Sequence, residues 1–424
     1  MLGRYISLSA WKVVILTTLF IAIVGLLRFS MPHWPLPLDT IKAKPRGPLT
    51  FKRDGTFQIS IFEDLHFGEN AWTSWGPQQD VRSVQVMNQI LDAEPEIGLV
   101  VLNGDLITGE CTFLENSTHY VEQIVSPMVQ RDLTWASTYG NHDSGYNISR
   151  KAILAREQRW SNSRTNPKVF DKNAGVTNYF LPVYDSNCST HELASVCTPS
   201  LLLWFFDSRG GHFFQQKDPT TGQLIGQPDW VDVSVVEWFQ HTNAALVSKA
   251  GRAIPSLAFV HIPVNASLAL QNARVDAHRQ PGINDEPVSE QGQGWCADGT
   301  DDGSCEYGGQ DTPFMQAITT TPGLMALFTG HDHGNTWCYK WQGLVPGLTV
   351  KGNGINLCFG QHTGYGGYGD WIRGSRQVVV SLENLEDLVV DTYIRLESGD
   401  VVGAVSLNAT YGQDVYPVTP NDKT

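Results

Sequence analysis

The chain has 424 residues, of which 41% are hydrophobic and only 17% are charged, and this composition excludes disorder throughout. Its length fits one large α/β domain with tails as well as it fits two domains. With 29 basic and 43 acidic residues, the net charge is −14. A nucleic-acid-binding protein needs the opposite sign, so we expect no nucleic acid among the partners.

The N-terminus has the pattern of a targeting segment. Arg4 and Lys12 precede an uncharged, mostly apolar run at 13–27, which Arg28 ends. The run is short for a membrane span of ~20 residues and is typical of a signal peptide, but a cleavage site with small residues is not evident after it. We therefore expect residues 1–30 to be an uncleaved signal-anchor that tethers the protein to a membrane. The alternative is a cleaved signal peptide and a secreted or vacuolar protein.

Two further patterns indicate that the rest of the chain faces the secretory lumen or the cell exterior. More N-glycosylation sequons occur than chance predicts: they are at Asn116, Asn147, Asn187, Asn265 and Asn408. The seven cysteines suggest disulfide bonds, which need an oxidising compartment. The expected pairs are Cys188–Cys197, Cys296–Cys305 and Cys338–Cys358, which leaves Cys111 over. The alternative is seven buried free thiols.

Beyond a Pro-rich stalk at 31–56, predicted strands and helices alternate along the chain. Strands are expected at 57–62, 97–102, 134–138, 201–206, 256–260 and 324–329. Helices are expected where apolar residues recur at helical spacing, around 81–91, 120–129 and 231–248. Residues 377–407 are mostly β, and 411–424 have the composition of a frayed tail. Strand–helix–strand units with a β-rich end predict an α/β sandwich at 57–410, with sheets inside and helices outside.

Polar side chains that can bind metals stand where five of these strands end. The segments are Asp64-Leu65-His66, Asn103-Gly104-Asp105, Gly140-Asn141-His142-Asp143, His261 and Gly330-His331-Asp332-His333. Ligands of open α/β sheets bind beyond the carboxyl ends of the strands, so the five segments should meet at one edge. Each motif alone has a simpler explanation, such as a helix cap or a core histidine. Five in order, each at a strand end, are not accidental.

The residue types predict a centre of two metal ions. Two cations held ~3.5–4 Å apart need a bridging carboxylate with imidazole and oxygen donors around it. Asp105 is the expected bridge, because one carboxylate offers two oxygens. The other ligands divide between a first site with Asp64, His66 and His333 and a second site with Asn141, His261 and His331. In Asp-x-His and His-x-His the outer residues share one side of an extended segment, which suits joint coordination.

This ordered set resembles the signature of the calcineurin-like metallophosphoesterase superfamily, which runs D-x-H, G-D, G-N-H-D/E, H and G-H-x-H. The resemblance covers roughly residues 57–408 and implies a four-layer α/β/β/α sandwich that hydrolyses phosphate esters. The segments 104–109, 204–208 and 364–369 are similar to the single-domain fungal and plant branch grouped with purple acid phosphatases. True purple phosphatases have Gly in place of His66 and a metal-binding Tyr in place of Thr108. Because the tyrosinate that favours Fe(III) is absent, two ions of Fe, Zn or Mn are all compatible with the sequence.

The metal centre and the resemblance together predict the chemistry. The metal ions are expected to generate a bridging hydroxide that attacks phosphorus in line. His142, next to the ligand Asn141, would protonate the leaving oxygen, with Asp143 orienting its ring. The substrate is expected to be a phosphate ester, either a small molecule or a phosphoprotein, and Asn141, His142 and His362 are expected to contact it. The leading hypothesis is a phosphomonoesterase of the secretory pathway; the alternatives are a phosphodiesterase acting on nucleotide or lipid head groups and a membrane-tethered binding protein without activity.

Overall fold

The structure is a computed structural model that describes residues 46–424, with the side chains of 301–303 and 306 left out of the description. The predicted signal-anchor at 1–30 and most of the predicted stalk lie outside the described residues. Within 46–424, no helix combines the length and the apolar character needed to cross a membrane.

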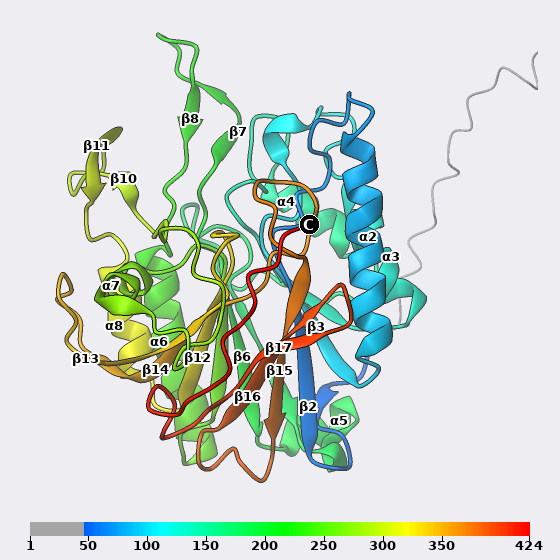
Figure 1. Ribbon diagram of the computed structural model, residues 1–424, viewed down its shortest axis with the longest axis vertical. Coiled ribbons are helices and arrows are strands. Elements are labelled where there is room, and N and C mark those ends of the chain that lie inside the picture. The colour runs from blue at the N-terminus through cyan, green and yellow to red at the C-terminus, as the bar shows by residue number, and fades with distance from the viewer. Residues whose placement is uncertain (1–45) are drawn as a thin grey trace, which may run out of the picture. The chain divides into compact units, whose positions relative to one another are not determined.

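Two β-sheets form the centre of the described domain (Figure 1). The seven-stranded sheet has the order β1 (Leu49–Thr50), β5 (Tyr179–Tyr184), β6 (Leu201–Phe206), β9 (Ser256–Val260), β12 (Leu324–Thr329), β14 (Gly352–Phe359) and β13 (Cys338–Gly343). The six-stranded sheet has the order β17 (Val401–Leu407), β16 (Val390–Leu396), β15 (Gly374–Ser381), β2 (Thr56–Phe62), β3 (Ile97–Asn103) and β4 (Trp135–Thr138). Because β2, β3 and β4 are parallel, and β6, β9 and β12 are parallel, the carboxyl ends in each set share one edge.

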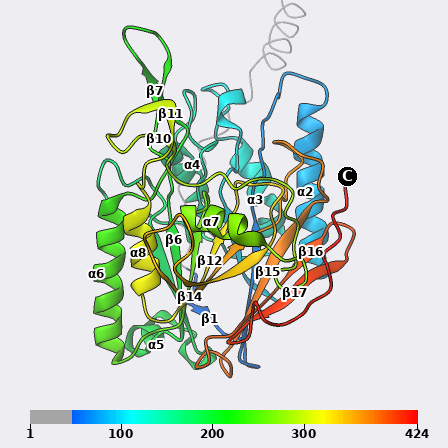
Figure 2. The ribbon, with the colours of Figure 1, turned by 60° about the vertical axis from the view of Figure 1, so that its left-hand side comes forward.

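Helices cover the outer face of each sheet (Figures 1 and 2). The six-stranded sheet carries α2 (Gly76–Ala93), α3 (Tyr120–Gln130) and α4 (Arg150–Glu157), and the seven-stranded sheet carries α6 (Val233–Ala250), α7 (Asn265–Arg274) and α8 (Thr312–Thr320). Strand β3 contributes side chains to two cores, one between the sheets and one between sheet and helices. Leu99 and Val101 pack between the sheets, whereas Val100 and Leu102 pack against the helices, because successive strand residues point to opposite faces. The predicted four-layer α/β/β/α sandwich is confirmed.

The edges of the domain differ from the predicted boundaries of 57 and 410. Leu49–Thr50 pair with β5, and Phe51 is buried in the core between the sheets, so the fold begins within the predicted stalk. At the other end Tyr411 is buried in the same core, and residues 422–424 pair with 370–372. Buried Phe51 and Tyr411, together with the backbone pairing at Leu49–Thr50 and at 422–424, thus hold both ends of the domain in place. The composition of these segments alone indicated a linker and a tail.

The remaining elements are short. They are η1 (Gly109–Cys111), η2 (Ser186–Cys188), α5 (His191–Val196), the hairpin β7 (His212–Lys217) with β8 (Leu224–Gly226), and the hairpin β10 (Gln293–Trp295) with β11 (Asp301–Tyr307). The three predicted disulfides are present: Cys188–Cys197, Cys296–Cys305 and Cys338–Cys358. The last joins two residues that face each other across β13 and β14. Cys111 is a free thiol, as expected.

Candidate metal centre

The structure brings all seven predicted metal ligands to the carboxyl ends of five strands. Asp64 and His66 follow β2, Asp105 follows β3, Asn141 follows β4, His261 follows β9, and His331 and His333 follow β12. All are buried apart from Asn141 and His331, which are half-buried. The two sheets therefore contribute to one site, since β2, β3 and β4 belong to one sheet and β9 and β12 to the other.

The backbone at this site is strained. Four of the seven residues adopt the left-handed conformation that favours glycine: Asp64 (φ 53°), His66 (φ 49°), Asp105 (φ 49°) and His331 (φ 75°). Such conformations cost on the order of 1–3 kcal/mol each and persist only where surrounding contacts hold them. Here hydrogen bonds between the loops hold them, because the Asp64 carboxylate accepts from the His331 amide at 3.1 Å and Asp105 Oδ1 accepts from the His142 amide at 2.8 Å.

The donor atoms form two clusters that meet at Asp105. Asp64, His66 and His333 offer ligand atoms within 4.8 Å of one another, and so do Asp105, His261 and His331. Asp105 Oδ2 lies 2.9 Å from His261 Nε2 and 3.8 Å from His66 Nε2, which places it between the clusters. His66, Asp105 and His142 form a third such group, which links the two clusters through Asp105. The division of the ligands into two metal sites and the bridging role of Asp105 stay predictions.

Hydrogen bonds orient three of the imidazoles. The Nδ1 atoms of His261 and His333 donate to the carbonyl oxygens of Asn103 at 2.8 Å and of Tyr368 at 2.9 Å, and His66 Nδ1 lies 3.2 Å from the Thr108 hydroxyl. A carbonyl can only accept, so Nδ1 of His261 and of His333 carries a proton, and Nε2 is the ring nitrogen that faces the cluster.

The buried Oδ1 atom of Asn141 makes no hydrogen bond. Buried polar atoms are normally paired, and this one belongs to a predicted metal ligand. This donor set of carboxylate oxygens, imidazole nitrogens and one amide oxygen fits two transition-metal ions.

Metal binding requires ionised carboxylates and neutral imidazoles, and the carboxyl groups and two of the imidazoles fit this requirement. His261 does not, because the Asp105 carboxylate outweighs burial and raises the pKa of His261 to about 10, so a metal ion would displace a proton there. Burial opposes ionisation of Asp64 and Asp105, but the neighbouring imidazoles outweigh burial and hold the pKa of both carboxyls below the ordinary value. Burial lowers the pKa of His66 to about 3 and that of His331 to about 4. Each of these rings therefore keeps a lone pair for a metal ion at neutral pH.

His142 has a different partner from the one predicted. Its Nδ1 lies 2.6 Å from Oε1 of Glu110, and its ring stands edge-on to His66 with centroids 4.9 Å apart. Burial disfavours the charged ring, yet the carboxylates of Asp105 and Glu110 raise the pKa of His142 to about 9. Bound cations would oppose that shift. Glu110 was missed because only the fold brings η1 against the loop after β4.

Asp143 serves the backbone instead of His142. Its fully buried carboxylate accepts hydrogen bonds from the amides of Leu106 and Ile107 at 2.9 Å and from the amide of Gly140 at 2.8 Å. These bonds tie the loop after β3 to the loop after β4. The prediction that Asp143 orients His142 is therefore wrong, because the carboxylate serves three nearby amides and Nδ1 of His142 is paired with Glu110.

His362 was predicted to contact the substrate but is buried behind the site. Its Nε2 lies 3.2 Å from the Gly366 carbonyl oxygen, and its ring lies 3.8 Å from the ring of His333. The half-exposed side chain of that region is Tyr368, whose ring stacks on His333 at 4.0 Å and an interplanar angle of 9°. His362 thus supports a predicted ligand, and Tyr368 occupies the solvent side.

Four of the five sequons are at least partly exposed in the folded domain, at Asn116, Asn147, Asn187 and Asn408. Asn265 is different, because it begins α7 and is only 8% exposed. A glycan attached there would have no room in the folded domain. The predicted modification at Asn265 is therefore incompatible with this fold.

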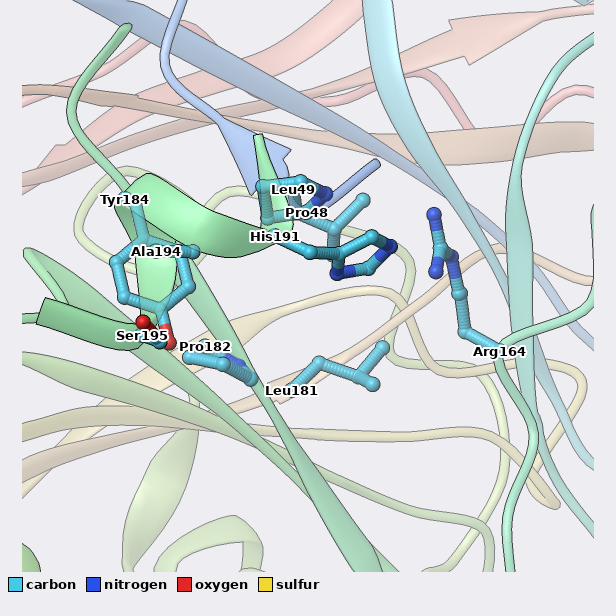
Figure 3. A pocket seen from close by; sticks show the side chains of 9 residues that line it. All are labelled: Pro48, Leu49, Arg164, Leu181, Pro182, Tyr184, His191, Ala194 and Ser195. Carbon is cyan, nitrogen blue, oxygen red and sulfur yellow. The ribbon is translucent and has the colours of Figure 1, made fainter. Parts of the chain in front are cut away.

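A separate pocket of about 310 Å³ lies at the other edge of the sheets, beside β1, β5 and α5 (Figure 3). Its two basic side chains are Arg164 and His191. Arg164 donates to the carbonyls of Arg46 and Gly47, and His191 Nε2 lies 2.6 Å from the Arg46 carbonyl oxygen. These side chains fasten the first described residues to the domain.

Comparison with known proteins agrees with the fold. The chain belongs to the calcineurin-like phosphoesterase family, whose sequence profile matches residues 61–335. It is 25% identical to an Arabidopsis thaliana protein named probable inactive purple acid phosphatase 28, over 92% of this chain and 94% of that one. It is 26% identical to phosphatase DCR2 of Saccharomyces cerevisiae, over 72% of this chain and 48% of that one.

Among solved structures, a dimetal phosphatase from Danio rerio aligns with 83% of this chain and 98% of its own, at 11% identity and a TM-score of 0.49. Family membership and the clustered donors imply a dimetal centre and a phosphate-ester substrate.

Proposed function

We propose that the protein is a metal-dependent phosphomonoesterase. The observation that carries the proposal is the convergence of six carboxylate and imidazole donors, Asp64, His66, Asp105, His261, His331 and His333, into overlapping groups linked by Asp105. A site that has lost its activity should have lost ligands, because strained buried charges destabilise a fold when they serve no purpose. The word inactive in the name of the Arabidopsis relative belongs to that protein, and the donor set of this chain is complete.

The residues around the clusters support general-acid chemistry. Two metal ions held by these ligands would acidify a bound water and offset the charge of the phosphoryl oxygens. His142 lies beside the first cluster, and Glu110 fixes its ring through Nδ1, which leaves Nε2 to give a proton to the leaving oxygen. Asn141 and His142 are the side chains proposed to contact the phosphate.

The metals are proposed to be Zn, Mn or Fe. Thr108 is buried and pairs with His66 Nδ1, so this position supplies no phenolate to select Fe(III). An imidazole and carboxylate set suits each of these ions.

We also propose that the enzyme works in the secretory pathway, held to a membrane by residues 1–30. Three disulfides support this placement, because such bonds persist in oxidising compartments. Treating the protein from its native host with a glycosidase tests the placement. An unshifted mass would contradict it.

The test of the function is metal analysis combined with paired hydrolysis assays of the full chain. We expect about two metal ions per chain and faster hydrolysis of a phosphomonoester than of the matching diester. Asp105→Asn should lose both ions and all hydrolysis. A preference for the diester would replace the proposal with a phosphodiesterase, and two bound ions without hydrolysis of either ester would indicate a binding protein.

A further inference from the structure

One loop covers the first metal cluster, and we call residues 364–370 the glycine loop. Gly367 comes so close to the cluster that a Cβ there would lie 2.6 Å from His333 Cε1 and 2.8 Å from His66 Cδ2. The Gly367 amide donates to the Glu69 carboxylate, and the Tyr368 carbonyl accepts from His333 Nδ1 at 2.9 Å. The position of this loop therefore determines the position of two proposed ligands.

Trp371 supports the glycine loop from behind. Its ring lies against Gly369, and a Cβ on Gly334, the residue after His333, would come within 2.5 Å of it. The indole Nε1 donates to Asp285 Oδ2 at 2.8 Å, and the Asp285 amide donates to the Gly334 carbonyl at 3.0 Å. Trp371 and Asp285 thus connect the glycine loop with the strand end that carries His331 and His333.

The C-terminal residues pair with the end of the glycine loop, at Lys423 and Trp371. Figure 1 shows the end of the chain beside this loop, which is drawn in orange. The Ile372 amide donates to the Asp422 carbonyl at 3.0 Å, and the Thr424 amide donates to the Asp370 carbonyl at 2.6 Å. Lys423 Nζ lies 2.8 Å from Asp285 Oδ2, 3.5 Å from Asp370 Oδ1 and 4.4 Å from the centroid of the Trp371 ring. The Lys423 ammonium group therefore contacts Asp285, Asp370 and Trp371 at once.

We infer that Lys423, Asp285 and Trp371 form a C-terminal clamp that positions the glycine loop on His333 and so sets the affinity of the first metal site. An isolated surface ion pair would contribute little. Here the ammonium group is held by backbone pairing on both sides of it, and it lies over an aromatic face as well as between two carboxylates. Lys423 is a positioning residue, since it acts through Trp371 and Tyr368 and does not touch the metal ligands.

The clamp predicts an asymmetry between the two metal sites. His261 and Asn141 receive their support from Asn103 and from the loops after β3 and β4, which are remote from Lys423. Loss of a group that orients a ligand typically weakens metal binding roughly 10–100-fold. His331 of the second site follows the same strand as His333, so loss of the clamp should weaken the first site more than the second. The metal part of this inference rests on the proposed function, whereas the effect on the glycine loop does not.

The experiment compares the full chain with Lys423→Ala, Lys423→Arg, Asp285→Asn and a chain shortened by residues 421–424, and Lys351→Ala at an exposed lysine is the control. Hydrogen exchange on metal-free protein should rise at least about 10-fold at amides 365–370 in the alanine, asparagine and shortened variants. Exchange should stay at the wild-type rate in Lys423→Arg, which keeps the charge, and in Lys351→Ala.

Competition with a chelator should then release one ion roughly 10–100 times more readily from the affected variants, with a smaller change for the second ion. Unchanged exchange at 365–370 in both Lys423→Ala and the shortened chain would overturn the clamp. Equal weakening of both metal ions would also overturn it. Because the exchange measurement uses metal-free protein, the clamp can stand even if the phosphatase assays fail.

Discussion

Gly367→Ala is the sharpest test of the metal centre, because the contacts of this glycine give the size of the effect. Gly367 has φ +76°, and its missing Cβ would lie 2.6 Å from His333 Cε1 and 2.8 Å from His66 Cδ2. Ordinary contact of a Cβ begins at 3.4 Å, so the new methyl group falls short by 0.8 Å at His333 and by 0.6 Å at His66. Either the loop or both rings must move.

That displacement is large on the scale of metal coordination. Metal–ligand distances tolerate about 0.2 Å, so a shift several times larger breaks the bond or forces the loop away. The left-handed backbone adds about 1–2 kcal/mol for any residue with a Cβ. We expect Gly367→Ala to lose the first ion at least roughly 10-fold more readily and to lower the rate of hydrolysis with it.

Gly222→Ala separates the clash from the backbone strain. Gly222 also has a positive φ, of +72°, but nothing lies within 4 Å of its missing Cβ. Metal content by mass spectrometry, chelator competition and thermal unfolding should be measured on both variants. Both should unfold at a lower temperature, whereas only Gly367→Ala should lose metal. Wild-type retention of two ions in Gly367→Ala would refute the placement of His66 and His333 at one site.

The general-acid assignment predicts that His142→Ala keeps both ions, while hydrolysis of an alkyl phosphate falls roughly 10²–10⁴-fold and that of an activated aryl phosphate falls less. Glu110→Gln should act in the same direction but more weakly, with the exposed Glu115→Gln as its control; equal losses on both esters would remove the proton-donor role. Asp143→Asn should instead lower stability by about 1–3 kcal/mol in denaturant unfolding, because the amide replaces an acceptor of buried backbone N–H groups. Any loss of activity in Asp143→Asn should be the same on both esters, and a selective loss on the alkyl ester would return the orienting role to Asp143.

The strands and the donor set could be predicted from the sequence because each depends on a local pattern. Leu201–Phe206, Ser256–Val260 and Leu324–Thr329 were predicted with the bounds that the structure has. Each is a short apolar run buried on both faces and bounded by polar or turn residues. Once those strands are parallel, the residues after them must meet at one edge.

What could not be predicted depends on contacts between remote segments. Glu110 lies five residues after Asp105, and only the packing of η1 beside the loop after β4 pairs it with His142. Lys423 gave no sequence signal, because its partners Asp285 and Asp370 are brought to it by two separate loops. His362 illustrates the opposite error, since a histidine near a metal motif was expected at the mouth of the site and is buried behind it.

The two positions at which this chain departs from true purple phosphatases are neighbours in space. Those enzymes have a metal-binding Tyr in place of Thr108 and Gly in place of His66. In this structure the Thr108 hydroxyl lies 3.2 Å from His66 Nδ1, and both side chains are buried. Each departure alone changes the number of donors at the first metal, whereas the two together exchange a phenol for an imidazole.

The double variant His66→Gly with Thr108→Tyr should reverse that exchange. Removing the imidazole makes room for the phenol, so the iron-loaded double variant should gain the visible charge-transfer band of a tyrosinate bound to Fe(III), which absorption spectroscopy detects. His66→Gly alone should lose metal from the first site. Thr108→Tyr alone should lose stability, because the phenol overpacks a buried position beside His66. A full complement of iron in the double variant without that band would mean that position 108 does not reach the metal, and the assignment of His66 to the first site would fail with it.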